Sequence, residues 1–310
     1  MFGLRYHVAS LAAVFVALAV GILLGVAVSG RVTDASEGLE EENLRNDNQR
    51  LQQDLEAARA AEDAANLRGE GSEELLARAY PALMSGRLEG ENVAMIFLGP
   101  SDGSARADIE RTLADADAGS PARVVALNVP VDGADLDSTL EGDEVLAGYA
   151  GDDGDYSELG RELGRELAES GETPLWDALS SQLVEEREGP EAPAVDSAVV
   201  VLTWMPPDDA NGDEEAAAEA EATTSLMEGL VRGLDDAGIP VVGTAASEDD
   251  PAMIEFYRDQ GISSVDDVDQ AAGRLALALL LDGAEPGHYG ISDEADGIVP
   301  PFEPVTDEGE

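Results

Sequence analysis

The chain has 310 residues and a formal net charge of −50 at pH 7, which opposes the phosphate backbone of nucleic acid and so excludes nucleic acid as a partner. It contains no Cys, which excludes disulfides, thiolate metal sites and Cys nucleophiles. All 17 basic residues are Arg and 44% of the residues are hydrophobic; because molar salt shortens the Debye length to about 3 Å, we expect a folded protein adapted to high salt and not a disordered acidic chain.

The first predicted element is a transmembrane helix, within an anchor at residues 1–30. Residues 8–28 carry no charge, and at about 1.5 Å per residue they extend roughly 32 Å, enough to cross a bilayer core. The alternative is a cleaved signal peptide with AVS at 27–29 as its cleavage site, but the apolar region of a signal peptide is shorter. Arg5 precedes the span and acidic residues follow it, so we expect a single-pass protein of the cell membrane with a cytoplasmic amino terminus and an extracytoplasmic carboxyl-terminal domain.

Small residues recur at every fourth position of this segment. Small side chains let two membrane helices approach closely, and Gly-x-x-x-Gly is the strongest pair of this kind. The spacing therefore predicts a dimer interface between two copies of the helix. The alternative is that Ala and Gly are simply common in membrane helices. The predicted interface consists of Ala13, Ala17, Gly21 and Gly25, with Ala9 and Ser29 continuing the pattern.

A coiled-coil stalk is predicted next, at residues 31–70. Residues 36–66 contain no Pro, and apolar positions follow steps of four and three. Asn48 falls at an a position, where a buried Asn favours two strands in register. We therefore expect a parallel homodimer, and the alternative is a monomeric helix lying against the outer domain. The predicted stalk interface consists of Leu44, Asn48, Leu51 and Leu55, followed by Ala58.

The outer domain is predicted at residues 71–290, with Gly69–Ser72 and Pro81 separating it from the stalk. Apolar runs without polar alternation, separated by helical patterns, are typical of parallel strands covered on both faces. We therefore expect a Rossmann-like α/β domain with a mostly parallel sheet, followed by an extended or disordered acidic tail at 291–310. The predicted strands are 92–98, 123–129, 196–203 and 240–243, and the predicted helices are 105–116, 136–149, 156–169, 174–186, 216–237 and one that includes 274–281.

One helical stretch of this domain repeats itself, as GRELGREL at Gly160–Leu167. Residues four apart lie on one helix face. The repeat therefore predicts a packing stripe of Leu163 and Leu167 beside a polar stripe of Arg161 and Arg165.

Motifs for catalysis or cofactor binding are missing from the sequence. There is no G-x-G-x-x-G, no G-x-x-x-x-G-K-[ST] and no G-x-S-x-G. LGPSDG at Leu98–Gly103 follows the first strand; it is either a ligand-binding loop or a tight turn in which Asp102 caps the next helix. His288 is the only candidate base in the outer domain. The sequence thus predicts a protein that is not an enzyme, with no catalytic and no cofactor-binding residues.

Metal ligands are not predicted by spacing. Asp152, Asp153 and Asp155 resemble a hard-cation site but lack the EF-hand spacing, so a solvated acidic face is favoured. The soft ligands for copper are scattered without a chelating spacing, and the residues alone leave any metal site unknown. These soft ligands are Met84, Met95, Met205, Met227, Met253 and His288.

The two ends of the chain carry a family resemblance. The opening FGLRYHVASLAAVFVALAVGILLG, the later SSVDDVDQAAGRLALALLLDG at Ser263–Gly283 and GHYG at Gly287–Gly290 resemble the MctB-like copper-transporter family of envelope proteins. The resemblance implies copper homeostasis or export, with copper as a transported or sensed ion, and pairing with a second envelope protein in envelope maintenance and division. From the residues, the alternative is a dimeric scaffold or regulator that binds another envelope or cell-division membrane protein.

Overall fold

The computed structural model describes residues 3–142, 144, 146–150, 154–189, 192–207, 214–247 and 249–302. Within the first helix, side chains are described at 14–26, 46, 48–69, 71–72 and from 74 onward. The chain divides into two compact units, Met1–Glu73 and Glu74–Glu310.

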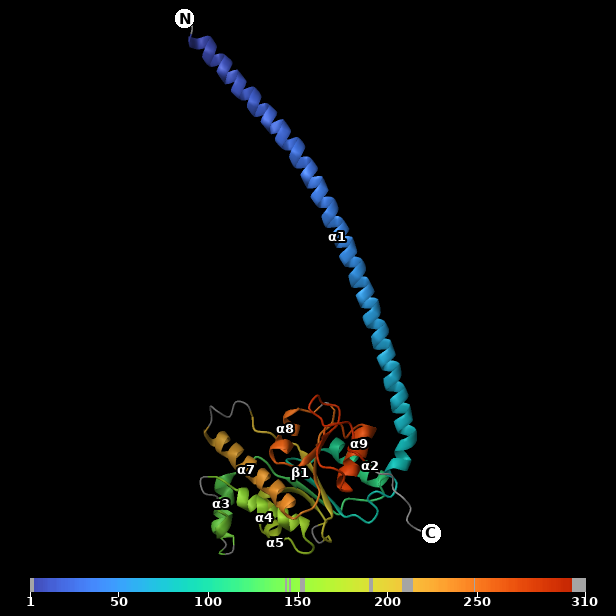
Figure 1. The fold of residues 1–310 in the computed structure, drawn as a ribbon. Helices are drawn as coiled ribbons and strands as arrows, with labels where there is room; N and C mark the ends of the chain where they lie inside the picture. Colours follow the sequence, from blue (N-terminus) through green and yellow to red (C-terminus); the bar gives the residue numbers. More distant parts are fainter. Residues whose placement is uncertain are drawn as a thin grey trace. The chain divides into compact units, whose positions relative to one another are not determined.

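The first unit is formed by helix α1, which spans Gly3–Met84 and reaches into the second unit (Figure 1). The helix continues through Gly69–Ser72, where the sequence predicted a loose connection. No helix within the described residues is long and apolar enough to cross a membrane. The predicted span at 8–28 lies outside the described side chains except at 14–26.

Pro81 does not separate the stalk from the domain, as the sequence suggested, because α1 continues through it to Met84. Proline removes one backbone hydrogen bond from a helix interior and clashes with the preceding turn. Here the proline stands in the last turn, where the helix is packed by Leu76, Tyr80 and Leu83 against the core of the second unit. Packing therefore offsets the weakened hydrogen bonding and keeps the turn helical.

A seven-stranded sheet forms the centre of the second unit, in the order β3-β2-β1-β4-β5-β6-β7. All neighbouring pairs are parallel except β2 and β3, which are antiparallel. This confirms the predicted α/β class with a mostly parallel sheet. The strands are β1 Val93–Leu98, β2 Arg123–Leu127, β3 Val184–Glu188, β4 Ser197–Leu202, β5 Val241–Thr244, β6 Ser263–Val265 and β7 His288–Tyr289.

Helices cover both faces of the sheet (Figure 1). This is why every residue of β1, β2, β4 and β5 is buried and why these strands are mostly apolar in sequence, without polar alternation. One face carries α3 Gly133–Glu141, α4 Ser157–Ala168, α5 Pro174–Ala178, α6 Ser180–Leu183, α7 Glu214–Asp236 and α8 Ala252–Asp259. The other face carries the end of α1, α2 Gly103–Asp115 and α9 Ala271–Leu281.

Helices α4 and α7 approach closely through glycine. A Cβ on Gly160 or Gly164 would fall within 3.0 Å of backbone atoms of α7, and one on Gly229 or Gly233 would fall equally close to α4. Real Cβ atoms essentially never show such distances. The predicted leucine stripe is buried, with Leu163 and Leu167 in the core, but the repeat also places two glycines in the helix contact.

Strand β3 differs from the sequence prediction, which placed a helix over 174–186. The helix α6 ends at Leu183, and Val184–Glu188 pairs antiparallel with β2 at the edge of the sheet. The strand lacks an apolar run because it lies at an edge, and it is held by ion pairs. Arg106 of α2 contacts Glu186 at 2.6 Å and Glu188 at 3.0 Å.

The carboxyl-terminal end adds elements that the sequence did not predict: α8, β6 and β7. The helix predicted at 136–149 is instead divided into α3, which ends at Glu141, and a short 3₁₀ helix, Ala147–Tyr149. The predicted tail at 291–310 is described to residue 302. Its first part folds back on β7, since the Asp296 amide donates to the His288 carbonyl at 2.7 Å and Tyr289 bridges to Gly297. Residues 303–310 lie outside the described residues.

Candidate functional site

The carboxyl edge of the sheet contains a cleft where the strand order reverses between β1 and β4. Open α/β sheets bind ligands at such a reversal, outside the carboxyl ends of the strands. The cleft has a volume of about 370 Å³ and lies between the start of α2, the end of β4 and the loops after β5 and β6. Its polar and thioether side chains include Asp102, Ser104, Asp108, Thr203, Met253 and Asp269.

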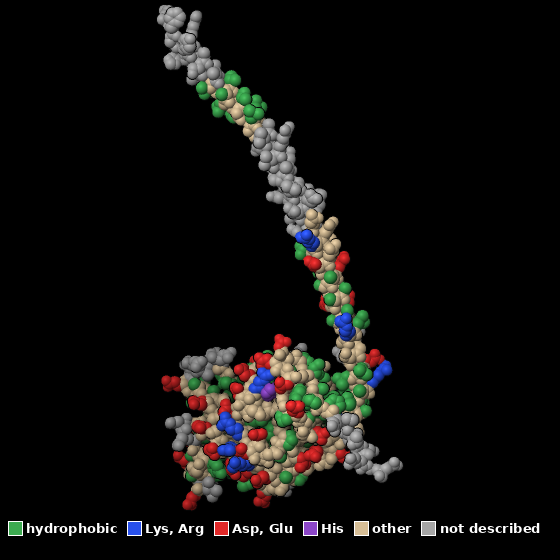
Figure 2. Space-filling model, viewed as in Figure 1, with side chains coloured by type: hydrophobic (Ala, Val, Ile, Leu, Met, Phe, Trp, Pro, Cys, Tyr) green, Lys and Arg blue, Asp and Glu red, His purple; other side chains and the backbone are tan. Residues whose placement is uncertain are grey.

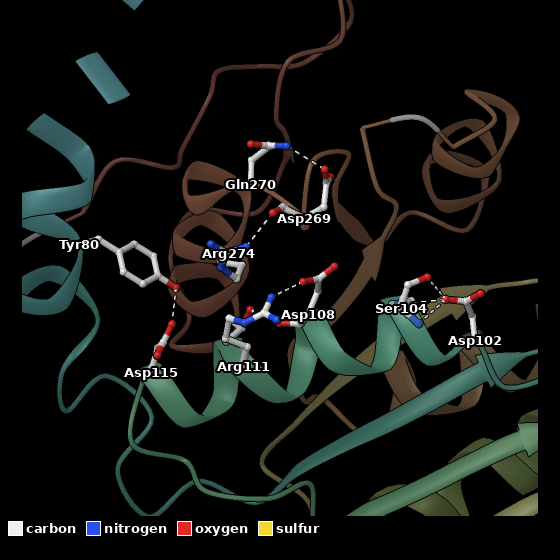
Figure 3. A network of polar contacts seen from close by, with 11 residues as sticks. Tyr80, Asp102, Ser104, Asp108, Arg111, Asp115, Asp269, Gln270 and Arg274 are labelled. Carbon is white, nitrogen blue, oxygen red and sulfur yellow. Dashed lines mark hydrogen bonds and ion pairs between the residues drawn. The ribbon is translucent and has the colours of Figure 1, made fainter. Parts of the chain in front are cut away.

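Asp102 lines this cleft at the start of α2 and caps that helix (Figure 3). Its carboxylate accepts hydrogen bonds from the Ser104 hydroxyl, from the Ser104 amide at 3.0 Å and from the Ala105 amide at 2.8 Å. These bonds, led by the Ser104 hydroxyl, lower the pKa of Asp102. The cap predicted from LGPSDG is confirmed, so the carboxylate itself occupies the positive end of the helix.

The loop between β6 and α9 also lines this cleft. Its Asp269 contacts both the loop after β5 and helix α9. Its carboxylate accepts hydrogen bonds from the Ser247 backbone amide at 2.7 Å and the Ser247 hydroxyl at 2.8 Å. It also accepts one from the side-chain amide of Gln270 at 2.8 Å. Burial alone would raise the pKa of Asp269, but these hydrogen bonds hold it below its usual value. Arg274 of α9 donates to the Asp269 carbonyl at 2.7 Å (Figure 3).

Asp266, in the same loop, borders a second cleft of about 620 Å³ beside α8. Its carboxylate accepts from the Ile291 amide at 2.8 Å and the Ser292 amide at 3.0 Å. Asp266 therefore ties the segment after β7 to the carboxyl edge. The loop 266–269 thus lines both clefts, with Asp266 in the larger one and Asp269 in the smaller one.

A polar network continues from this loop across the α9 face of the sheet (Figure 3). The Arg274 guanidinium lies 5.8 Å from the centre of the Tyr80 ring, and the Tyr80 hydroxyl donates to Asp115 of α2 at 3.0 Å. Burial raises the pKa of Tyr80 to about 12, so it stays a donor at physiological pH. The network fastens the end of α1 to α2 and α9.

Most candidate soft ligands serve in packing. Met84 and Met95 are buried in the core beneath α2 and α9, and Met227 is buried in the core of the opposite face. Met253 lines the first cleft. Among the described residues, no group of three or more His, Asp or Glu side chains is arranged to hold a metal ion.

His288 lies on the edge strand β7, where its Nδ1 is 3.0 Å from the Ser264 hydroxyl. Burial lowers the pKa of His288, which favours the neutral ring at pH 7. Ser264 is itself buried, so its hydroxyl is closed to an external substrate. The pair therefore joins β6 to β7 and resembles a structural contact more than a nucleophile with its base.

The residues predicted for the dimer interfaces lie on α1. Ala13 and Leu44 lie outside the described side chains. Ala17, Gly21 and Gly25 are exposed, and a Cβ on either glycine would meet nothing within 4 Å. In the predicted stalk, Asn48 is exposed, Leu51 is 67% exposed and Leu55 is 50% exposed.

The predicted acidic face is described only at Asp155, because Asp152 and Asp153 lie outside the described residues. Asp155 accepts from the Ser157 amide at 2.9 Å at the start of α4, and this bond lowers its pKa. Acidic side chains are spread over the visible face of the second unit, with few basic ones among them (Figure 2).

A comparison with known protein families identifies the family of this chain. The family model described as copper transport outer membrane protein, MctB, matches residues 1–300. The chain belongs to the MctB family. No curated protein matches it. The resemblance noted at the two ends of the chain is thus confirmed, and membership of the MctB family connects the protein with copper transport at the cell envelope.

The carboxyl-terminal sequence that carries the MctB resemblance also contributes lining residues to both clefts. Asp266, Asp269, Gln270 and Arg274 all fall within Ser263–Gly283 and all form the contacts described above. The sequence revealed this stretch as a family motif. It did not reveal what the acidic residues bind, because their partners lie elsewhere in the chain.

Proposed function

We propose that the protein is a membrane-anchored envelope protein of copper homeostasis that lowers cytoplasmic copper, with copper as the transported or sensed ion. The observation that carries this proposal is the match to the MctB family over residues 1–300. The outer domain would act by binding and organising, without catalysis.

The proposed anchor is the uncharged segment at residues 8–28. In its described part, large apolar side chains are exposed, among them Phe15 at 63% and Leu23 at 71%. Exposed apolar surface of this extent is costly in water and favourable in lipid. Arg5 before the segment and the acidic residues after it support a cytoplasmic amino terminus and an external α/β domain.

Deletion of the gene tests the copper role. We expect the deletion strain to accumulate more copper and to grow less well at high copper, and the full chain to restore both properties. Zinc tolerance should remain unchanged and serves as the control. Unchanged copper content together with unchanged copper tolerance would refute the proposal.

Calorimetry on the full chain in detergent and high salt then asks whether copper is bound directly. Cu(I) and Cu(II) are titrated in parallel with Ca²⁺, because a chain with 67 acidic residues binds cations nonspecifically. Stoichiometric copper binding that exceeds Ca²⁺ binding would support direct transport. Equal heats would support a role through another envelope protein.

We further propose that the protein is a homodimer through α1. Leu51 and Leu55 are large apolar side chains exposed on the predicted stalk interface, and pairing would bury them. Since the natural chain has no Cys, Leu51→Cys gives a single crosslinking site, and Gln53→Cys is a control off the predicted interface. A disulfide-linked dimer with the first variant and not the second is expected. Equal yields would refute the interface, and a crosslink to a different protein would favour the scaffold alternative.

The membrane part of the interface is tested in a membrane two-hybrid assay. Gly21→Leu and Gly25→Leu insert bulk where the helices are expected to touch, so the signal should fall several-fold. Ala19→Leu adds bulk on the opposite side and should leave the signal unchanged. An equal signal from all three variants would contradict the small-residue interface.

A further inference from the structure

Two buried polar side chains lie at the carboxyl ends of neighbouring strands without a partner in the described chain. Asp267, just after β6, is 1% exposed and neither carboxylate oxygen receives a hydrogen bond from the described residues. Thr244, at the end of β5, is 1% exposed, and its hydroxyl is likewise unpaired among them. Such groups are rare, because nearly all buried polar atoms in native proteins are hydrogen-bonded.

Both groups lie on the α9 side of the sheet. Thr244 is paired with Val265 of β6, and Val265 belongs to the core beneath α9, so the Thr244 side chain faces α9. Asp267 lies two residues beyond the end of β6, and its contact with Gly273 places it beneath α9.

Helix α9 closes over the carboxylate at a glycine. A Cβ on Gly273 would lie 2.5 Å from the Asp267 Oδ1 atom. The same Cβ would lie 2.1 Å from the Asp267 carbonyl oxygen, so only a residue without a side chain leaves room for the backbone and the carboxylate of Asp267 under the first turn of α9. The site is built by the fold and is closed to bulk solvent.

Among the described residues of the surrounding elements, no cationic side chain is paired with the Asp267 carboxylate. Burial, followed by the charges of the neighbouring Asp266 and Asp269, raises the pKa of Asp267 to about 7. Asp266 accepts from backbone amides after β7, and Asp269 accepts from Ser247. On α9, Arg274 is directed to the Asp269 carbonyl and the Tyr80 ring. An isolated buried carboxylate is strongly unfavourable.

We propose that Asp267 and the Thr244 hydroxyl bind a monovalent metal cation, Na⁺ or K⁺, beneath the first turn of α9. The ligands are hard oxygen atoms, which do not suit copper. A divalent ion takes several carboxylates, and here the two neighbouring carboxylates are engaged by amides and hydroxyl groups. A single carboxylate with a hydroxyl suits one positive charge. In the molar salt that the composition predicts, even a weak site of this kind is filled.

Cation-specific stabilisation tests the proposal. Thermal unfolding of the full chain in detergent is followed by circular dichroism at pH 8, in NaCl, KCl or tetramethylammonium chloride at equal molar concentration. All three salts screen charge, but tetramethylammonium is too large for the buried site. We expect the midpoint to be higher by roughly 5 °C in NaCl or KCl, in line with a ligand that binds only the native state.

Two variants separate this site from general salt effects. Asp267→Asn should lose the difference between the metal and tetramethylammonium salts, whereas the exposed Asp293→Asn should keep it. Thr244→Val keeps the side-chain shape but removes one ligand. It should raise about tenfold the Na⁺ or K⁺ concentration that gives half of the stabilisation, and it tests the site even if the Asp267 variant fails to fold. Equal midpoints in all three salts for the natural chain would overturn the proposal, and so would a retained difference in Asp267→Asn.

Discussion

The contact between α4 and α7 gives the sharpest prediction, for Gly229→Ala. A Cβ at Gly229 would fall within 3.0 Å of the Cα, C and O atoms of Ser157, whereas ordinary contact begins at 3.4 Å. These are backbone atoms, so the two helices must move apart because no side chain can rotate away. Overpacking of this kind costs about 3 kcal/mol, and the better helix propensity of Ala returns about 1 kcal/mol.

The expected net loss for Gly229→Ala is therefore about 2 kcal/mol. For a domain of this size it corresponds to a fall in the unfolding midpoint of roughly 6 °C. Thermal and denaturant unfolding in high salt, followed by circular dichroism, measures it. Gly103→Ala is the matched control, because a Cβ there meets nothing within 4 Å. If the two variants unfold at the same temperature, the close approach of the helices does not limit the fold.

Three other predictions concern capping, charge and pH. Asp102→Ala removes the cap of α2 and should cost about 1 kcal/mol, whereas Asp102→Asn should cost less because it can still accept from the two amides; equal losses would contradict the cap. Arg106→Gln breaks three ion pairs at the sheet edge and should destabilise more than Arg111→Gln, which breaks one, and the difference should shrink in molar salt; a salt-independent difference would argue against charge. Burial raises the pKa of Glu166 above its ordinary 4.5, so the stability contributed by its protonated form is lost as the pH rises above 4.5; the unfolding free energy of Glu166→Gln should therefore gain on that of the natural chain as the pH rises above 4.5, and a pH-independent difference would contradict this.

The sheet was predictable where burial on both faces makes a strand uniformly apolar, as in β1 and β4. Strand β3 was not, because its sequence VEERE is stabilised by partners such as Arg106 that are distant in the chain. Strand β6 has only three residues and depends on β5 and β7 for its hydrogen bonds. Very short strands, and charged strands at a sheet edge, lack the apolar run by which a buried strand is recognised in a sequence.

Only the contacts between residues close in sequence could be predicted at the candidate site. Asp102 caps the helix that follows it, and such a contact depends on residues two and three positions away. Asp266 and Asp269 bind segments around residues 291 and 247, so their spacing alone gave no indication of their role. The glycines of GRELGREL could have been recognised, since Gly160 and Gly164 show the same four-residue spacing as Gly21 and Gly25.

The two edge strands of the sheet affect whether copies of the protein aggregate. In dilute buffer a net charge of −50 keeps copies apart, but in molar salt that repulsion acts over only about 3 Å. An exposed strand edge is then an open template for aggregation. One edge is β3, which carries three Glu residues in five positions, and the other is the two-residue β7, covered in part by its bridge to Gly297. Both edges are poor templates for another strand, so resistance to fibril-like association comes from charged side chains on one edge strand and the short length of the other, and does not depend on long-range charge.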